Sequence, residues 1–198
     1  MDNKIPQIGI TGGIGSGKTT VCNIFEYFSI PVYYADDRAK YLMTNDTDLV
    51  EAIKESFGED AYFGDGSLNR AYLGNIVFSN PKKLKILNGL VHPAVHKDGA
   101  MWHSLQRDVP YTLNEAALMV ESGGYKRMDK LIVVTAPEDL RIERVMKRDK
   151  TTAEAVRARM NNQLSEEEKV LHADHVIYND GSHSLIEQVF IIHRRLSS

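Results

Sequence analysis

The stretch QIGITGGIGSGKTTVCNIF, residues 7–25, decides the fold. Its first residues, QIGI, are typical of the end of a buried strand, and KTTVCNIFEYF, residues 18–28, carries apolar side chains at helical spacing. Between these elements, residues 12–19 match the pattern G-x-x-x-x-G-K-[ST] completely. Glycine permits positive φ and leaves backbone N–H groups open to the close approach of an anion. The stretch therefore predicts a phosphate-binding loop that leads into a helix N-terminus.

The loop predicts a nucleoside triphosphate site, because several donors on one concave surface suit a chain of phosphates. Lys18 would reach the β- and γ-phosphates, and the Oγ1 atom of Thr19 would ligate Mg²⁺. A glycine-rich turn without a ligand is the alternative, which the complete motif in its strand–turn–helix context disfavours. The residues expected to contact the nucleotide are Gly13, Ile14, Gly15, Ser16, Gly17, Lys18, Thr19 and Thr20.

Composition limits the class of protein. The 198 residues suffice for one domain or one core with insertions, and 42% of them are hydrophobic. A net charge of -3 gives no overall basic field for nucleic acid, and the lone Cys22 cannot form an internal disulfide. The first residues lack the apolar region of a signal peptide, and no apolar run approaches the ~18 residues of a membrane span. We therefore expect a cytoplasmic protein with no membrane, nucleic-acid or obligate protein partner.

Strand and helix patterns alternate along the rest of the chain. Extended, apolar segments recur at IPVYYA (30–35), VPYTLNEAAL (109–118), KLIVVTAP (130–137) and HVIYNDG (175–181). Residues 69–107 are largely helical in pattern, with breaks expected near 79–81 and 92–93. The alternation predicts an α/β protein whose mostly parallel sheet binds ligands at the carboxyl ends of its strands. The excess of helix between 40 and 107 indicates an insertion, and the polar helices between 147 and 172 indicate a mobile flap.

Two groups of charged residues follow the predicted strands. Asp36 and Asp37 come after the second strand, where a carboxylate could accept a proton from an attacking hydroxyl or help to hold Mg²⁺. Capping of the next helix is the alternative for both. A basic group could instead close over the transferred phosphate, or form a solvated face with Glu143 and Glu154 as partners. Its members are Arg141, Arg144, Lys147, Arg148, Arg157 and Arg159.

Two classes of function share such a glycine loop: kinases and GTP-driven switches. A switch should carry a D-x-x-G turn and an N-K-x-D loop, and the sequence has neither. An early aspartate, a large insertion and an arginine-rich flap favour a small-molecule kinase that uses ATP. The pair His92 and His96 has no evident third ligand, so the sequence does not favour a zinc site.

Five stretches, in order, resemble the dephospho-CoA kinase family. They are the loop GITGGIGSGKTT, the segment VYYADDRAK, the helical signature GSLNRAYLGNIVFSNPKKLKILNGLVHPAV (66–95), the lid RVMKRDKTTAEAVRARMNNQ and the C-terminal ADHVIYNDGS. There are departures. Tyr34 stands where the family's first aspartate is usual, and Ala116-Ala117 replaces a frequent Val-Pro. Asp37 stands where the family has an apolar residue, so the resemblance assigns the catalytic aspartate to Asp36 alone.

The resemblance implies a three-layer α/β P-loop kinase fold in a single unit. The core would comprise about residues 1–59, 108–146 and 173–198. A helical acceptor-binding insertion would span about 60–107, and a helical lid about 147–172.

The resemblance also implies a reaction: ATP-dependent phosphorylation of the ribose 3′-hydroxyl of dephospho-CoA, giving CoA and ADP in the last step of CoA biosynthesis. Another P-loop small-molecule or nucleotide kinase is the alternative, and a nucleotide-binding switch is a more distant one. The implied catalytic residues are Asp36, Lys18 and Arg148. Arg144 and Asn179 would bind ATP, and the implied substrate-binding residues are Thr11, Asn69, Arg70, His92 and Glu121.

Overall fold

The computed structural model describes residues 5–198, so the interpretation of the first four residues lies outside the described part. The chain divides into two compact units. One contains residues up to 34 together with 106–198, and the other contains 35–105. None of the helices within 5–198 combines the length and the apolar character that a membrane span requires.

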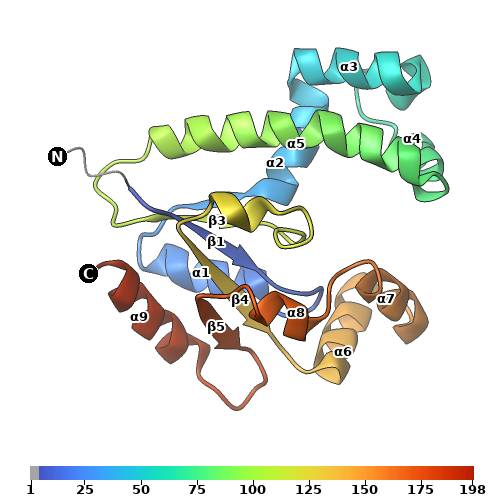
Figure 1. Ribbon diagram of the computed structural model, residues 1–198. Helices are drawn as coiled ribbons and strands as arrows, with labels where there is room; N and C mark the ends of the chain where they lie inside the picture. Colours follow the sequence, from blue (N-terminus) through green and yellow to red (C-terminus); the bar gives the residue numbers. More distant parts are fainter. Residues whose placement is uncertain (1–4) are drawn as a thin grey trace. The chain divides into compact units, whose positions relative to one another are not determined.

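A parallel sheet forms the centre of the first unit (Figure 1). Within residues 5–198 it has five strands in the order β2-β3-β1-β4-β5. The strand that precedes the glycine loop, β1, is therefore central, and its carboxyl end lies between those of β3 and β4. All four later strand predictions are confirmed, although β3 is shorter than the extended segment 109–118. The strands are β1 (Gln7–Thr11), β2 (Val32–Tyr34), β3 (Thr112–Glu115), β4 (Lys130–Thr135) and β5 (His175–Tyr178).

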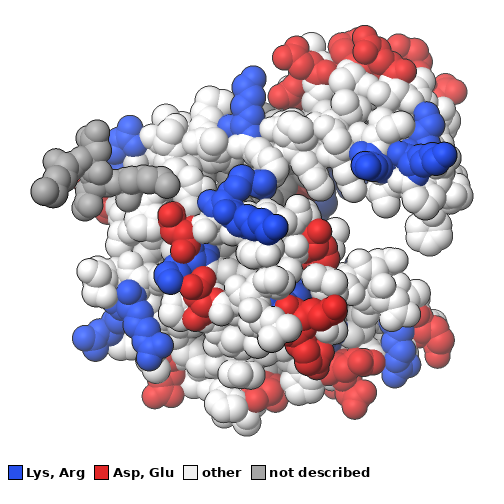
Figure 2. Space-filling model, in the orientation of Figure 1, with Lys and Arg blue, Asp and Glu red and all other residues white. Residues whose placement is uncertain are grey.

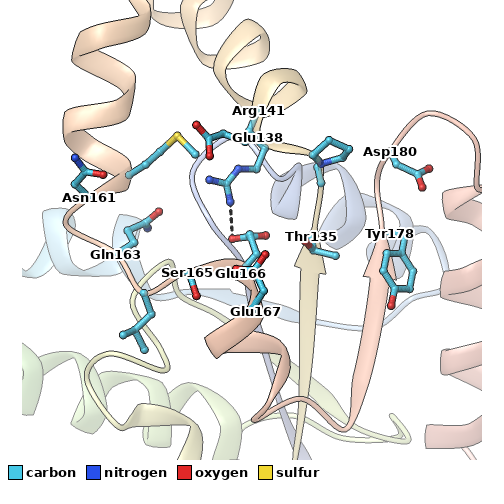
Figure 3. A pocket seen from close by; sticks show the side chains of 14 residues that line it. Thr135, Glu138, Arg141, Asn161, Gln163, Ser165, Glu166, Glu167, Tyr178 and Asp180 are labelled. Atoms are coloured by element: carbon cyan, nitrogen blue, oxygen red, sulfur yellow. Dashed lines mark ion pairs between the residues drawn. The ribbon is translucent and has the colours of Figure 1, made fainter.

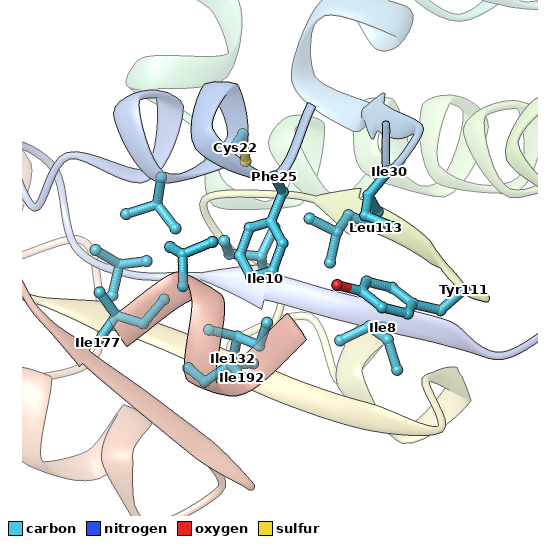
Figure 4. Packing of buried hydrophobic residues seen from close by; sticks show 13 residues of the cluster. Ile8, Ile10, Cys22, Phe25, Ile30, Tyr111, Leu113, Ile132, Ile177 and Ile192 are labelled. Atoms are coloured by element: carbon cyan, nitrogen blue, oxygen red, sulfur yellow. The ribbon is translucent and has the colours of Figure 1, made fainter. Parts of the chain in front are cut away.

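Two helices, α1 (Lys18–Tyr27) and α9 (Leu185–Leu196), cover one face of the sheet. Phe25 of α1 points into the main core, against apolar side chains of the sheet such as Ile10 and Ile132 (Figure 4). Cys22 is buried in the same cluster. Burial, reinforced by the Glu115 carboxylate, raises the pKa of its thiol, so Cys22 stays protonated and acts as a core residue.

A smaller cluster covers the opposite face of the sheet, which confirms the predicted three layers. Leu131 and Val133 of β4 pack there against Met119, Leu164 and Val170. Polar helices follow the carboxyl end of β4, where the sequence predicts a flap. The elements that pack on this face are η2 (Gly124–Arg127) and α8 (Glu166–Val170), whereas α6 (Glu138–Asp149) and α7 (Ala153–Met160) pack against each other and against Ile14 of the glycine loop.

The second unit is helical and has its own core. Side-chain caps begin three of its helices: Asp46 accepts from the N–H of Leu49, and Asn69 and Asn80 act likewise. Because α2 and α3 pack with α5, this unit begins at residue 35, earlier than the expected insertion boundary near 60. Its elements are α2 (Ala35–Asn45), α3 (Thr47–Phe57), η1 (Glu59–Ala61), α4 (Arg70–Phe78) and α5 (Pro81–Ser104).

The long helix α5 corrects one prediction. The expected break near 79–81 is present, because Asn80 caps α5 and Pro81 occupies its first position. The expected break near 92–93 is wrong, because α5 runs through Pro93 without ending. A proline removes one helical hydrogen bond, but packing of α5 against α2, α3 and α4 stabilises the helix on both sides of it.

Replacement of Phe25 by alanine is expected to destabilise the first unit strongly. Phe25 has no exposed surface, so its removal leaves a cavity that the surrounding sheet and helices can fill only in part. Such a change costs about 3–5 kcal/mol in the free energy of unfolding. Tyr27, on the same helix, is 91% exposed and serves as the control. Urea unfolding followed by circular dichroism checks this; equal losses for Phe25→Ala and Tyr27→Ala would contradict the packing described.

Candidate active site

The glycine loop joins the central strand to the first helix. Gly12, Gly15 and Gly17 have φ angles of 155°, 79° and 93°, in the region that disfavours a side chain. The N–H of Ser16 donates to the carbonyl of Gly13 (3.1 Å), which closes a turn within the loop. The carbonyl of Gly17 accepts from Val21 (3.1 Å), the beginning of the helical pattern. The sequence prediction of a loop between strand and helix is confirmed.

Close neighbours fix the path of this loop. A Cβ atom on Gly12 would collide with the carbonyl oxygen of Val134, and one on Gly17 would collide with Nδ2 of Asn179. The Ser16 hydroxyl is buried and, among the described residues, makes no hydrogen bond. The first N–H groups of α1 have no partner within the helix. Backbone donors, a helix N-terminus and glycines without side chains fit a phosphate group.

Lys18, the first residue of α1, folds back along the loop. Its Nζ atom donates to the carbonyl of Gly12 at 2.9 Å, and its side chain is half-buried. The predicted cation is therefore on the loop itself, with a flexible stem that can turn toward a phosphate. Thr19 and Thr20 follow on the exposed side of the first turn.

Arg144 and Asn179, which the resemblance assigns to ATP binding, contact each other at the loop, although 35 residues separate them. The Nη2 atom of Arg144 donates to the backbone oxygen of Asn179 (3.1 Å) and to its Oδ1 atom (3.2 Å). In turn, Nδ2 of Asn179 donates to the carbonyl of Ser16 (2.8 Å). The arginine of α6 and the asparagine after β5 thereby hold the second half of the glycine loop.

Arg148 lies at the exposed end of α6. It donates to both carboxylate oxygens of Asp149, through Nε (2.7 Å) and Nη2 (3.1 Å), and Arg159 donates to the same carboxylate (2.7 Å). These guanidinium groups hold the pKa of Asp149 well below its usual range. α6 ends at Asp149, and Lys150 has a φ of 51°, so the chain turns between α6 and the next flap helix.

Two predicted substrate-binding residues of the first unit hold segments of the protein together. The buried Thr11 hydroxyl donates to the carbonyl of Ala116 (2.8 Å). The Glu121 carboxylate accepts from the N–H of Leu164 (3.0 Å) and lies 3.3 Å from Nζ of Lys169. Both residues therefore have structural partners in this conformation.

The second unit contains the other predicted residues. Asp36 and Asp37 are exposed in the first turn of α2, and Asp37 pairs with Lys40 at 2.6 Å. The amide of Asn69 caps α4, accepting from Tyr72 (3.1 Å), and donates to the carbonyl of Asp60 (3.0 Å).

Arg70 and His92 are exposed on α4 and α5. The rings of His92 and His96 lie 6.4 Å apart between centroids. Within residues 5–198, no group of three or more His, Cys, Asp or Glu side chains is arranged to hold a metal ion.

Sequence reasoning missed a group of side chains at the first half of the loop. Gln163 and Glu166 accept from the N–H groups of Ile14 (2.9 Å) and Gly13 (3.0 Å), respectively. Glu166 also pairs with Arg141 at 2.6 Å (Figure 3). Both acceptors line a cavity of about 720 Å³ beside α6 and α8. The sequence SEEEK gives the helix start at Ser165, through a capping box, but no signal for the docking of Glu166.

The glycine loop follows the central strand of a parallel sheet, and basic flap helices follow β4 in the sequence. These features define the class: the protein is a P-loop kinase. Within this class, the chain belongs to the dephospho-CoA kinase family, whose profile matches residues 7–184. The predicted membership is confirmed.

Relatives and solved structures agree. A dephospho-CoA kinase from Salinibacter ruber is 46% identical over 177 residues, 88% of this chain and 89% of the relative. A crystal structure of a Thermus thermophilus protein has a TM-score of 0.88 at 35% identity, covering 99% of this chain and all of that one. A dephospho-CoA kinase from Campylobacter jejuni has a TM-score of 0.71 at 28% identity, with 96% of each chain covered.

Replacement of Lys18 by alanine is expected to nearly abolish kinase turnover while the fold remains intact. The side chain lies on the loop surface and packs in none of the hydrophobic clusters. Loss of one preorganised charge at a transferring phosphate lowers kcat on the order of a hundredfold or more. Steady-state kinetics and circular dichroism on one preparation check this. A folded variant with near-wild-type turnover would remove Lys18 from the active site.

Proposed function

We propose that the protein transfers the γ-phosphoryl group of ATP to the ribose 3′-hydroxyl of dephospho-CoA, giving CoA and ADP. One observation carries the proposal: Arg144 and Asn179, from two family motifs far apart in the sequence, meet at the glycine loop. Residues from a loop, a flap helix and a strand end thus form one anion-binding surface. Family membership supports the choice of acceptor.

Different residues of the chain would contact different parts of the bound nucleotide. The amides of residues 15–20 would hold the phosphates, since those of Gly13 and Ile14 already have side-chain acceptors, and Lys18 would neutralise charge on the β- and γ-phosphates. Arg144 would keep Asn179 and the loop in place and add positive charge beside the phosphates. Thr19, exposed on the first turn of α1, would be the protein ligand of Mg²⁺. Mg²⁺ commonly takes few protein ligands and completes its shell with phosphate oxygens and water, and it neutralises charge between the β- and γ-oxygens.

Asp36 would accept the proton of the attacking hydroxyl. β2 ends at Tyr34, and its carboxyl end lies at the same edge of the sheet as the start of the glycine loop, because the strands are parallel. Asp36 follows two residues later, exposed in the first turn of α2. Asp37 pairs with Lys40, and the family has an apolar residue at its position, so the resemblance favours Asp36 over its neighbour.

Residues 60–107 would recognise the acceptor. Dephospho-CoA is an anion, and exposed cations favour its binding. Figure 2 shows acidic side chains gathered over α3 and basic side chains near the start of α5. The basic residues there are Lys82, Lys83 and Lys85, with Arg70 exposed on α4. Arg70 and His92 remain the proposed contacts, whereas Asn69 would contribute through its cap of α4.

The proposal includes a cytoplasmic enzyme that acts without an obligate protein partner, a membrane or nucleic acid. The buried, protonated thiol of Cys22, which is the chain's lone cysteine, is compatible with a reducing compartment.

A coupled assay of ADP release tests the function directly. The purified protein is supplied with ATP and Mg²⁺ and offered dephospho-CoA, adenosine, AMP or shikimate in parallel. Turnover with dephospho-CoA at least tenfold above the other acceptors is expected. Preference for AMP or shikimate would replace the proposed acceptor by another one within the same class of kinase.

Replacement of Asp36 by asparagine is expected to lower kcat by roughly 100- to 10,000-fold, the usual worth of a general base, with little change in KM for ATP. Asparagine keeps the shape of the side chain but cannot take a proton. Asp37→Asn is the matched control, because its neighbouring carboxylate pairs with Lys40. Equal effects of the two substitutions, or a larger effect of Asp37→Asn, would show that the base has been placed one residue away from its true position.

Replacement of Arg148 by alanine is expected to lower kcat strongly and to change Kd for ATP by less than about tenfold. The flap would bring this guanidinium to the γ-phosphate on closure, at the cost of its two contacts with Asp149. Arg148→Lys should recover only part of the activity, since an ammonium cannot make the two-point contact.

The contacts of Arg148 also support a purely structural role, in which it only stabilises the end of α6. In that case Arg148→Ala would lower the melting temperature and leave kcat nearly unchanged. Measurement of kcat, ATP affinity and melting temperature on the same preparation distinguishes the two roles.

A further inference from the structure

The first half of the glycine loop is held by side chains that the catalytic assignment does not use. The N–H of Gly13 donates to Oε1 of Glu166 at 3.0 Å, and the N–H of Ile14 donates to Oε1 of Gln163 at 2.9 Å. Two consecutive backbone donors of the loop therefore have partners on one short segment, residues 163–166. That segment follows the flap helix α7 and leads into α8.

Glu166 lies close to the backbone of Gly13. A Cβ atom on Gly13 would collide with Oε1 of Glu166 and would lie 2.5 Å from Nη1 of Arg141, so a side chain there would displace both groups. Unlike Gly12, Gly15 and Gly17, Gly13 does not have a positive φ. A glycine at position 13 therefore leaves room for the carboxylate and the guanidinium beside the loop.

The charge of Glu166 is balanced by buried cations. Its Oε1 atom lies 2.6 Å from Arg141 and 3.9 Å from Nζ of Lys169, and the Glu166 side chain is only 15% exposed. Lys169 has no exposed surface and also pairs with Glu121 at 3.3 Å. Two carboxylates and two cations thereby form one network next to the loop. In such a network, removal of one charge leaves the others uncompensated.

A rigid support carries this network. Ser165 and Glu168 form a capping box at the start of α8, and Leu164 and Val170 pack against the sheet beside Leu131 and Val133. Figure 3 shows Arg141 pointing from α6 toward the Glu166 carboxylate on α8. Glu166 is therefore fixed relative to β4, which hydrogen-bonds in parallel to the strand that leads into the loop.

We propose that Glu166 is a positioning residue for nucleotide binding: with Gln163, it orients the peptide groups of Gly13 and Ile14 so that the following amides face the triphosphate. A glycine-rich loop has large conformational freedom, and ordering it during binding would weaken affinity. With the Glu166 contact, the loop is already ordered in the folded protein before ATP binds. The inference rests on the proposed role of the glycine loop in ATP binding. It does not depend on which acceptor the enzyme phosphorylates.

Calorimetric titration with Mg·ATP, without an acceptor, tests the proposal. Glu166→Ala should weaken ATP binding by roughly tenfold, the usual worth of a charge-assisted hydrogen bond. KM for dephospho-CoA should change by less than about twofold. Glu166→Gln should have a smaller effect, since its amide oxygen can still accept from Gly13. Glu167→Gln is the matched control, because Glu167 is the neighbouring carboxylate and lines the same cavity.

Two outcomes would overturn the proposal. Unchanged ATP affinity with a lower melting temperature in Glu166→Ala would show that Glu166 only stabilises the fold. Tighter ATP binding would show that Glu166 competes with the phosphates for the loop instead of orienting it.

Hydrogen exchange of the Gly13 and Ile14 amides, measured by NMR without any ligand, keeps the test independent of the proposed function. The Gly13 amide should exchange faster in Glu166→Ala than in wild type, and less so in Glu166→Gln, whose amide oxygen can still accept; Glu167→Gln should leave it unchanged. Gln163→Ala removes the acceptor of the Ile14 N–H and should speed exchange of that amide, which keeps the test available if Glu166→Ala fails to fold. Unaltered exchange of both amides would contradict the positioning role. A wild-type protein that binds ATP but does not phosphorylate dephospho-CoA would refute the proposed acceptor and leave this inference standing.

Discussion

The protein must hold its most flexible segment in one shape. A loop with Gly12, Gly13, Gly15 and Gly17 can turn its amides toward an anion, but the same glycines favour many other conformations. The order has to come from outside the loop. Nδ2 of Asn179 bonds to its second half, and the segment that carries Glu166 bonds to its first half. The sheet, the flap and the C-terminal strand all contribute to this task.

The parallel sheet allows residues from distant parts of the sequence to hold the glycine loop. Because all strands end at the same edge, residues that follow β4 and β5 reach the loop that follows β1 without long connections. Arg141 and Arg144 lie on consecutive turns of α6 and serve opposite halves of the loop: Arg141 pairs with Glu166, and Arg144 holds Asn179. The basic group in the flap therefore has at least two tasks near the nucleotide, and its exposed members, such as Arg148, differ in pairing from the buried Arg141.

Much of this was predictable from the sequence, and the remainder has physical reasons. The loop and the strands follow from local pattern and from motifs. The helix break expected at Pro93 is absent, because packing along α5 outweighs the effect of one proline. The docking of Glu166 carries no local signal, since SEEEK resembles any exposed helix start until Lys169 is seen to be fully buried. The residues of the site that sequence reasoning missed are those whose roles depend on contacts across more than 100 positions.

The central claim is that the amides at the start of α1 bind the triphosphate in a loop already ordered by the fold. Titration of ¹⁵N-labelled protein with Mg·ATP, and separately with adenosine, tests it most directly. The largest amide shift changes should fall in residues 15–20 and appear with ATP but not with adenosine, with little change in Gly12 and the strand before it. Shift changes of equal size with adenosine, or changes that spare residues 15–20, would contradict the account.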